Sequence, residues 1–341
     1  MCATTDPPHN RKDNSKDMHM SDALLSAPVA IAADVAAATL LAVASTRLKK
    51  ESDSGLIPLM GVAGAFIFAA QMLNFSIPGT GSSGHIIGGV LLAALLGPWA
   101  GFLTLASVII IQCLVFADGG LMALGCNLIN MGAITTLVAY PMIFRPLLKF
   151  PAPAWKIMAV SVLACVVGLE GGALMVTFET ALSGITALPT GDFLLLMTAI
   201  HLAIGICEGI ATGVVLIFVG KSAPSLLNRE QAHKLSGRKI RNIVIGFAAA
   251  ALLFAGILAF FASSDPDGLE WSIMKLTGTP DLPATDTGSI AQGAAAVQTA
   301  TSVMPDYGNS FSGIAGVCMV IILVWGLSGF LLKLRKSRQT A

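Results

Sequence analysis

The chain has 341 residues, of which 55% are hydrophobic and only 11% are charged, and its mean hydropathy is +0.80. A soluble domain carries about 25% charged residues, because its surface must be wetted. A chain with less than half that share of charged residues cannot cover a globular surface with charge. The composition therefore predicts a polytopic membrane protein and excludes a soluble enzyme, a disordered chain and a fibrous repeat. The net charge of +1 gives no reason to expect a nucleic-acid partner.

Nine apolar segments are candidates for membrane helices, since a spanning helix needs about 20 mostly apolar residues. In chain order they are 23–46, 56–73, 85–96, 99–116, 122–144, 155–183, 193–219, 243–263 and 313–334. The third is short, and Gly97-Pro98 separates it from the fourth, so these two could form a re-entrant pair. The predicted fold is an all-α membrane bundle of about nine helices.

The basic residues divide sharply between the two sides of this bundle. If the N-terminus lies outside, the cytoplasmic pieces are 47–54, 145–156, 220–242 and the C-terminal tail. They hold three, three, six and four Lys and Arg residues, which is 16 of the chain's 20. Because cytoplasmic loops of membrane proteins are rich in Lys and Arg, the split predicts an outside N-terminus and a cytoplasmic C-terminus.

The basic connection 221–242 separates a seven-helix region, 18–220, from a helical hairpin, 243–341. The hairpin's outer loop is rich in Pro, Gly, Ser and Thr, and we expect it to be largely irregular. Residues 1–17 are polar and lack the apolar core of a signal peptide.

Several familiar motifs do not qualify as sites. Gly79, Gly81 and Gly84 have GxGxxG spacing, but the next acidic residue is Asp118, beyond two apolar segments, so a dinucleotide site is excluded. Gly220-Lys221-Ser222 lacks the upstream glycine of a phosphate loop at the right distance. The six cysteines contain no CxxC pair that would suggest zinc or a disulfide framework.

Polar side chains at membrane depth are costly and are functional candidates by default. They are Asp34, His85, Asn127, Asn130, Glu170, Glu179, His201 and Glu208. His201 and Glu208 are two helical turns apart and face the same side, as a proton or cation relay or as a structural hydrogen-bonded pair. Asn127 and Asn130 could line a site or only hydrogen-bond across helices. Asp118, in Ala117–Gly120, is interpreted as a plain turn residue.

A metal chelate is possible at Met18-His19 if Met18 is the first residue of the mature protein. The terminal amine, the amide nitrogen of His19 and its imidazole would then supply three nitrogens in a plane, and His85 could supply the fourth. A square plane of four nitrogens suits Ni(II) or Cu(II). His85 is expected to open a helix on the outer side, the same side as His19. The alternative is that His19 is an interfacial histidine and His85 a helix-start residue without a ligand role.

Four blocks of the sequence, in order and spacing, resemble one family. They are 18–26 (MHMSDALLS), 83–89 (SGHIIGG), 118–132 (DGGLMALGCNLINMG) and 201–209 (HLAIGICEG). The family is the substrate-capture M subunit of cobalt/nickel energy-coupling-factor (ECF) transporters, the CbiM/NikM type. Residues 264–270 (SDPDGLE) resemble the PDGLE signature of the small N subunit of the same systems. The chain therefore looks like an M–N fusion, preceded by a 17-residue extension that the family pattern lacks and that we expect to be absent from the mature protein.

The resemblance implies a metal site built from Met18 (amine), His19 (amide and imidazole) and His85 (imidazole), in agreement with the chelate. It leaves Asn127, Asn130, His201 and Glu208 as possible supporting residues around the ligands. It also implies two kinds of partner, a membrane coupling subunit and a pair of cytoplasmic ATPases, which fits the missing phosphate loop. No cofactor is expected, because nickel or cobalt is the transported substrate.

The sequence thus predicts a plasma-membrane component that captures Ni(II) or Co(II) at the outer face for ATP-driven uptake, and that catalyses no covalent reaction. One alternative is a cation-coupled secondary metal transporter, although no inverted repeat is visible. Another is an intramembrane metalloenzyme built on His201 and Glu208, which would need at least three protein ligands. We expect the PDGLE segment to assist transport without donating a ligand.

Overall fold

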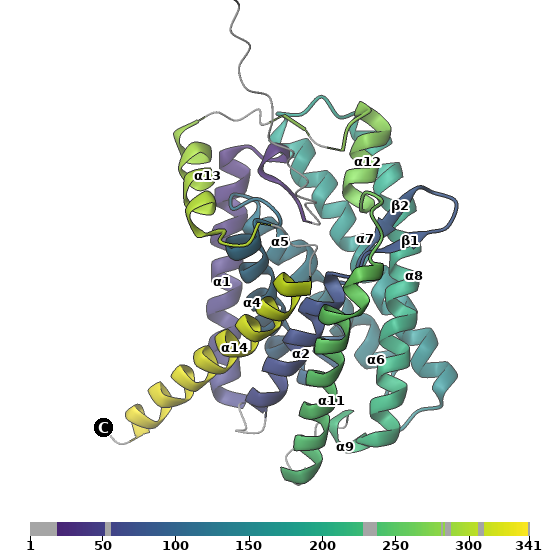
Figure 1. The fold of residues 1–341 in the computed structure, drawn as a ribbon, viewed down its shortest axis with the longest axis vertical. Coiled ribbons are helices and arrows are strands. Elements are labelled where there is room, and N and C mark those ends of the chain that lie inside the picture. The colour runs from purple at the N-terminus through teal and green to yellow at the C-terminus, as the bar shows by residue number, and fades with distance from the viewer. Residues whose placement is uncertain are drawn as a thin grey trace, which may run out of the picture.

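A computed structural model describes residues 19–51, 56–227, 237–280, 282–283, 288–305 and 310–339, and nearly all of its regular structure is helical (Figure 1). Met18 and the rest of 1–18 lie outside the described residues. The all-α prediction is confirmed, with one small addition. A two-stranded hairpin, β1 (Phe75–Ile77) and β2 (Ser82–Gly84), pairs Ser76 with Ser83.

Five helical segments are long and apolar enough to cross a membrane. Four of them are the single helices α1 (Ala27–Glu51), α4 (Pro98–Phe116), α7 (Ala154–Ser183) and α8 (Thr190–Ser222). The fifth is a continuous run of three elements, α5 (Leu124–Asn127), the π-helix η2 (Leu128–Phe144) and α6 (Arg145–Leu147). Shorter apolar stretches lie in α2 (Leu56–Gln71), α11 (Gly237–Gly256) and α14 (Ser310–Gln339). The described part of the chain is therefore a multi-pass membrane protein.

The third predicted segment, 85–96, is helical over only part of its length. α3 (Gly89–Leu96) has 8 residues, about 12 Å at 1.5 Å per residue, which is too short to cross a bilayer. It packs on α4 and also contacts α9 (Pro224–Leu227), at the end of the bundle away from the β-hairpin (Figure 1). Our expectation that His85 opens a helix is therefore wrong: His85 lies in the link between β2 and α3, outside both elements.

The outer loop of the C-terminal hairpin is not largely irregular, as the sequence had suggested, since two helices, α12 (Gly268–Thr277) and α13 (Ser289–Thr301), occupy much of it. Asp267 explains where α12 begins. Its carboxylate accepts from the backbone N–H of Glu270 at 2.8 Å, and the Glu270 carboxylate accepts from the Asp267 N–H at 3.2 Å. This reciprocal capping box satisfies two helix-end donors.

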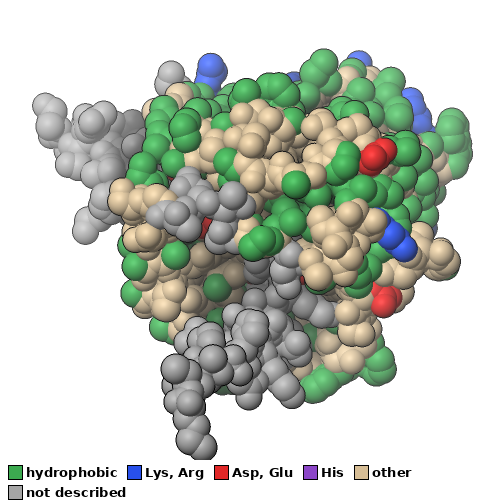
Figure 2. All heavy atoms as spheres, turned by 90° about the horizontal axis from the view of Figure 1, so that it is seen from above, with side chains coloured by type: hydrophobic (Ala, Val, Ile, Leu, Met, Phe, Trp, Pro, Cys, Tyr) green, Lys and Arg blue, Asp and Glu red, His purple; other side chains and the backbone are tan. Residues whose placement is uncertain are grey.

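Small residues let the helices approach closely. A Cβ on Gly209 would lie 2.3 Å from Val162 Cα, and one on Gly205 would lie 2.9 Å from Val166 Cα, so α7 and α8 pack almost backbone to backbone. The C-terminal hairpin packs on α2, where Gly316 makes room for the Phe68 ring. The end of the molecule that carries α12 and α13, here called the α12 end, shows few charged side chains (Figure 2).

Candidate metal site

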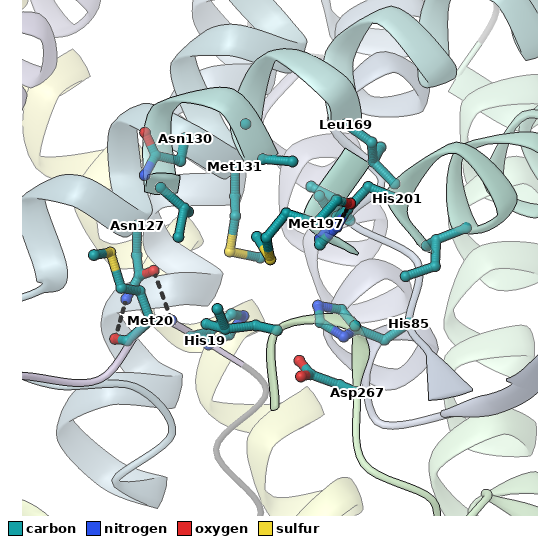
Figure 3. Close-up of a pocket in the computed structure, with 17 residues that line it drawn as sticks. His19, Met20, His85, Asn127, Asn130, Met131, Leu169, Met197, His201 and Asp267 are labelled. Atoms are coloured by element: carbon teal, nitrogen blue, oxygen red, sulfur yellow. Dashed lines mark hydrogen bonds between the residues drawn. The ribbon is translucent and has the colours of Figure 1, made fainter. Parts of the chain in front are cut away.

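A small pocket of about 70 Å³ lies toward the α12 end, among segments that are far apart in sequence (Figure 3). The segment 19–20, the link between β2 and α3, the α5–η2 helix, α7, α8 and the start of α12 all contribute to it. The lining residues are His19, Met20, His85, Ile87, Asn127, Asn130, Met131, Leu169, Gly172, Ala173, Val176, Met197, His201, Ile204, Asp267, Gly268 and Leu269.

Two of the three predicted ligand residues meet in this pocket. The imidazole rings of His19 and His85 lie 5.7 Å apart, centroid to centroid, and are nearly perpendicular at 86°. His19 is almost fully buried, with 3% of its surface exposed. The two histidines are 66 positions apart in the chain, and it is the fold that brings the two rings together.

Asn127 fixes the backbone next to His19. Its side-chain oxygen accepts from the Met20 N–H and its side-chain NH₂ donates to the Met20 carbonyl, both at 3.1 Å. The Gly120 N–H donates to the same carbonyl at 3.1 Å. Gly119, whose φ is +80°, leaves room for this approach, since a Cβ there would lie 2.7 Å from His19 Cβ. Asn127 therefore lines the pocket and holds the backbone beside His19, while its role around a bound metal stays a prediction.

Asp118 is a site residue that sequence reasoning missed. It is 2% exposed, and its Oδ1 lies 3.3 Å from His19 Nδ1, so its carboxylate orients the imidazole. Our interpretation of Asp118 as a plain turn residue is wrong. The sequence feature that could have indicated this role is the Asp-Gly-Gly segment directly after an apolar helix, because its two glycines allow another segment to come close.

His85 presents a shielded ring nitrogen to the pocket. Its Nδ1 is buried and has no hydrogen-bond partner among the described residues. Burial first, and the neighbouring His19 ring second, lower the pKa of His85 to about 3, so its imidazole is neutral at physiological pH. A neutral imidazole is the form that binds a metal ion.

Glu208 holds the chain that follows His85. Its two carboxylate oxygens accept from the backbone N–H groups of Ile87 at 2.8 Å and Gly88 at 3.0 Å, and the side chain is fully buried. His201 lines the pocket, but its Nδ1 contacts the Met197 carbonyl at 2.7 Å. The predicted hydrogen-bonded pair of His201 and Glu208 is therefore wrong: the two side chains have separate partners, and only His201 lines the pocket, while the relay stays a prediction.

Asn130 connects the pocket to a second buried carboxylate. Its NH₂ group donates to Glu179 Oε2 at 2.7 Å, while its Oδ1 is shielded and has no hydrogen-bond partner among the described residues. Both predicted roles of Asn130 are therefore present, since it lines the pocket and hydrogen-bonds across helices.

The PDGLE segment closes the pocket from the α12 end. The Pro266 carbonyl accepts from the Ser83 N–H at 2.7 Å, and the Trp271 indole donates to the Thr80 carbonyl at 3.0 Å, so the segment is bound to the β-hairpin that precedes His85. Asp267 lines the pocket close to His85 (Figure 3). Burial and the adjacent Glu270 carboxylate raise the pKa of Asp267. Sequence reasoning placed Asp267 in a loop and could not anticipate this proximity.

Within the part of the chain that the structure describes, no three His, Cys, Asp or Glu side chains are grouped so that they could hold a metal ion. The pocket supplies two neighbouring imidazoles at nearly right angles, a third imidazole nearby and two carboxylates around them. A metal ion bound here would therefore need further donors, such as main-chain nitrogens.

Comparison with known proteins identifies the family of the chain. Residues 19–226 match the family described as cobalt uptake substrate-specific transmembrane region (CbiM), and residues 241–334 match the PDGLE domain. A putative fused nickel transport protein NikMN of Archaeoglobus fulgidus is 30% identical over 92% of this chain and 99% of its own length. A probable fused nickel transport protein LarMN of Lactiplantibacillus plantarum is 31% identical over 76% of this chain and 78% of its own.

A solved structure, a truncated transition metal transporter, has a TM-score of 0.53 and 31% identity, and it covers 60% of this chain and 98% of its own. The CbiM match precedes the PDGLE match along this chain, and the Archaeoglobus relative aligns over 92% of the chain and therefore over both parts. The chain therefore belongs to the CbiM family of cobalt/nickel transport membrane components, and it carries a PDGLE domain in the same polypeptide.

Proposed function

We propose that this chain is the substrate-capture component of an ATP-driven ECF-type transporter that takes up Ni(II) or Co(II). The observation that carries the proposal is the meeting of His19 and His85 in a pocket that the PDGLE segment covers. Relatives described as nickel transport proteins and a cobalt transport protein CbiM support the substrate class.

The proposed ligands are the Met18 amine, the amide and imidazole nitrogens of His19, and the His85 imidazole. His19 can close a chelate ring with its own amide nitrogen only through Nδ1, the atom that faces Asp118 in this structure. Coordination therefore requires the His19 ring to turn, or Asp118 to move aside. The hydrogen bonds of Asn127 to Met20 keep the chain next to the chelate in place, which is the usual role of groups surrounding a metal site.

The partners in this proposal are a membrane coupling subunit and two cytoplasmic ATPases, because the sequence carries no phosphate loop of its own. The N-terminus and the α12 end would face outward and the C-terminus would be cytoplasmic, as the distribution of Lys and Arg indicates. Metal would then enter from outside, and ATP hydrolysis in the partners would drive its release inward.

The choice of metal follows from the donor set. Four nitrogens in a plane favour Ni(II), whereas Co(II) often takes additional ligands. We therefore expect tighter binding of Ni(II) than of Co(II) by the isolated chain.

The experiment that tests the function is metal analysis of the purified protein combined with uptake by cells that also express the coupling subunit and the ATPase pair. One nickel or cobalt ion per chain and ATP-dependent uptake are expected. Uptake that persists with inactive ATPases would instead favour a cation-coupled secondary transporter.

A further inference from the structure

Two buried glutamines connect the opposite sides of the metal pocket without lining it. Gln71 is the last residue of α2, and Gln112 lies near the end of α4. Both side chains are 0% exposed. Burying a primary amide is costly unless it is hydrogen-bonded, so the partners of these two side chains show what the amides hold in place.

Gln71 holds the chain that follows His85. Its Nε2 donates to the Ile87 carbonyl at 2.9 Å, and Glu208 accepts from the N–H of the same residue. The link between β2 and α3 belongs to neither element, so side chains here take the place of the hydrogen bonds of regular structure. The backbone two residues after His85 is thus held by α2 on one side and by α8 on the other.

Gln112 fixes the orientation of the Gln71 amide. Its Nε2 donates to Gln71 Oε1 at 2.6 Å. If the Gln71 amide were turned over, its NH₂ would face the NH₂ of Gln112 and its oxygen would face the Ile87 carbonyl. Neither of those pairs can form a hydrogen bond. Gln112 therefore keeps the Gln71 NH₂ group directed at Ile87.

The backbone of Gln112 holds the other side of the site. Its carbonyl accepts from the Asp118 N–H at 3.0 Å, where the chain leaves α4. The Asp118 carboxylate in turn lies against His19. A single residue therefore holds the loop that orients His19 and, through Gln71, the link that carries His85.

We propose that Gln71 and Gln112 are positioning residues of the metal site, which hold the His85 imidazole where it can complete a nitrogen plane with His19. Neither side chain donates to the metal, because each acts through a backbone segment of the pocket wall. The inference deepens the proposed function and rests on it, since it requires His85 to be a ligand.

The test is a double-mutant cycle between Gln71 and His85, with Ni(II) affinity of the purified mature protein measured by calorimetry. Gln71→Met keeps a side chain of similar length and removes the amide. It should lower the affinity about tenfold, as removal of a group that orients a ligand does. In the His85→Ala background the same substitution should cause no further loss, because no ring is left to position.

Gln112→Met provides a second route through the same cycle. It should also lower the affinity, and the loss should again disappear in the His85→Ala background. The matched control is Thr104→Val on the same helix. Thr104 is equally buried, but its hydroxyl donates to the Ala100 carbonyl of α4 itself, so Ni(II) affinity should stay at the parental level.

The absorption spectrum of bound Ni(II) supplies a readout that a general loss of stability would not move. A poorly aligned nitrogen gives a weaker ligand field, so the d–d band of Ni(II)-loaded Gln71→Met should shift to longer wavelength. Thr104→Val should keep the parental band. Thermal melts of the metal-free variants confirm that each one is folded.

Equal losses of affinity in the parental and His85→Ala backgrounds, with an unmoved band, would make the glutamines merely structural and would overturn the inference. Parental affinity in both Gln71→Met and Gln112→Met would overturn it as well. Either result leaves the proposed function intact. If His85→Ala itself binds Ni(II) like the parent, the proposed ligand set fails, and this inference fails with it.

Discussion

At the scale of single residues, the pocket separates the groups proposed to bind metal from those that hold them. His19 and His85 present imidazoles to each other, whereas Asp118, Asn127 and Glu208 act on a ring or a backbone beside them. Removal of a ligand and removal of a supporting residue should therefore differ in how far they lower the affinity for Ni(II).

His85→Ala should lower the affinity for Ni(II) on the order of 100-fold or more, because it removes one strong donor from a four-donor site and leaves the chelate of Met18 and His19. His201→Ala should bind Ni(II) like the parent, since its Nδ1 is engaged with Met197. Equilibrium calorimetry on both variants, with thermal melts to confirm folding, makes the comparison. If His201→Ala loses binding and His85→Ala does not, the proposed ligand set is wrong.

Asn127→Ala should weaken Ni(II) binding about 10-fold or more, the usual effect of removing a group that orients a ligand. It removes both side-chain hydrogen bonds to Met20 and frees the backbone that carries His19. Asn130→Ala is the matched control, because Asn130 pairs with Glu179 and makes no contact of this kind with Met20. Equal losses in the two variants would show that the effect is general destabilisation.

At the scale of elements, the PDGLE segment and α12 act as a cover that is anchored on the β-hairpin. The capping box of Asp267 and Glu270 starts α12, and Trp271 binds the hairpin through Thr80. On the other side of the site, Gln298 of α13 donates to the Gly119 carbonyl at 2.7 Å, so the loop that carries Asp118 is held as well.

Replacing both Asp267 and Glu270, by Asn and Gln respectively, should leave the number of metal ions per chain unchanged, because oxygen donors are unsuited to a nitrogen square plane. The helix cap should be retained, because Asn caps a helix about as well as Asp and Gln can take the place of Glu in a capping box, so the hydrogen exchange of α12 should stay close to that of the parent. Metal analysis of the purified variant and hydrogen exchange of α12 test the two statements. Loss of bound metal would make Asp267 or Glu270 a ligand.

At the scale of the whole molecule, the C-terminal hairpin and the M region form one packed body. α11 and α14 pack on α2, and the loop between them reaches the metal pocket. The site is therefore completed only when both parts of the fusion are present. Its chemistry also depends on where the mature chain begins.

The mature protein should begin at Met18, since the proposed chelate needs a free amine there. N-terminal sequencing and intact mass of the metal-loaded protein test this directly. A chain made to start at Met18 should bind Ni(II), and the same chain with three alanines inserted before Met18, which move the amine out of reach of a chelate with His19, should bind it far more weakly. Three alanines added at the C-terminus are the control. Metal-loaded, active protein that retains Met1 would contradict the prediction.

The sequence by itself determined the class of the molecule. Low charge, long apolar runs and the division of Lys and Arg require a multi-pass helical protein. The hydropathy of a segment decides whether it crosses the bilayer, and the charges that flank it decide in which direction, so both can be assessed from the segment alone. Local spacing also predicts the Met18-His19 chelate, whose three donors lie in two consecutive residues, and this stays a prediction because Met18 lies outside the described residues. The prediction of a helix over 85–96 from hydropathy was wrong for its first residues, because Gly88, with φ of +79°, bends the chain before α3 begins.

Only the tertiary structure decided which distant residues meet. From the sequence, Asp118 and Asp267 are interpreted as loop residues. His201 and Glu208 are interpreted as a pair, because their helical spacing puts them on the same side of one helix. In the fold, close packing at Gly119 admits His19 beside Asp118, and the two oxygens of Glu208 are taken by the backbone of Ile87 and Gly88. Helical periodicity fixes the direction in which a side chain points, but the partner it finds depends on packing between segments far apart in the chain, which local sequence does not encode.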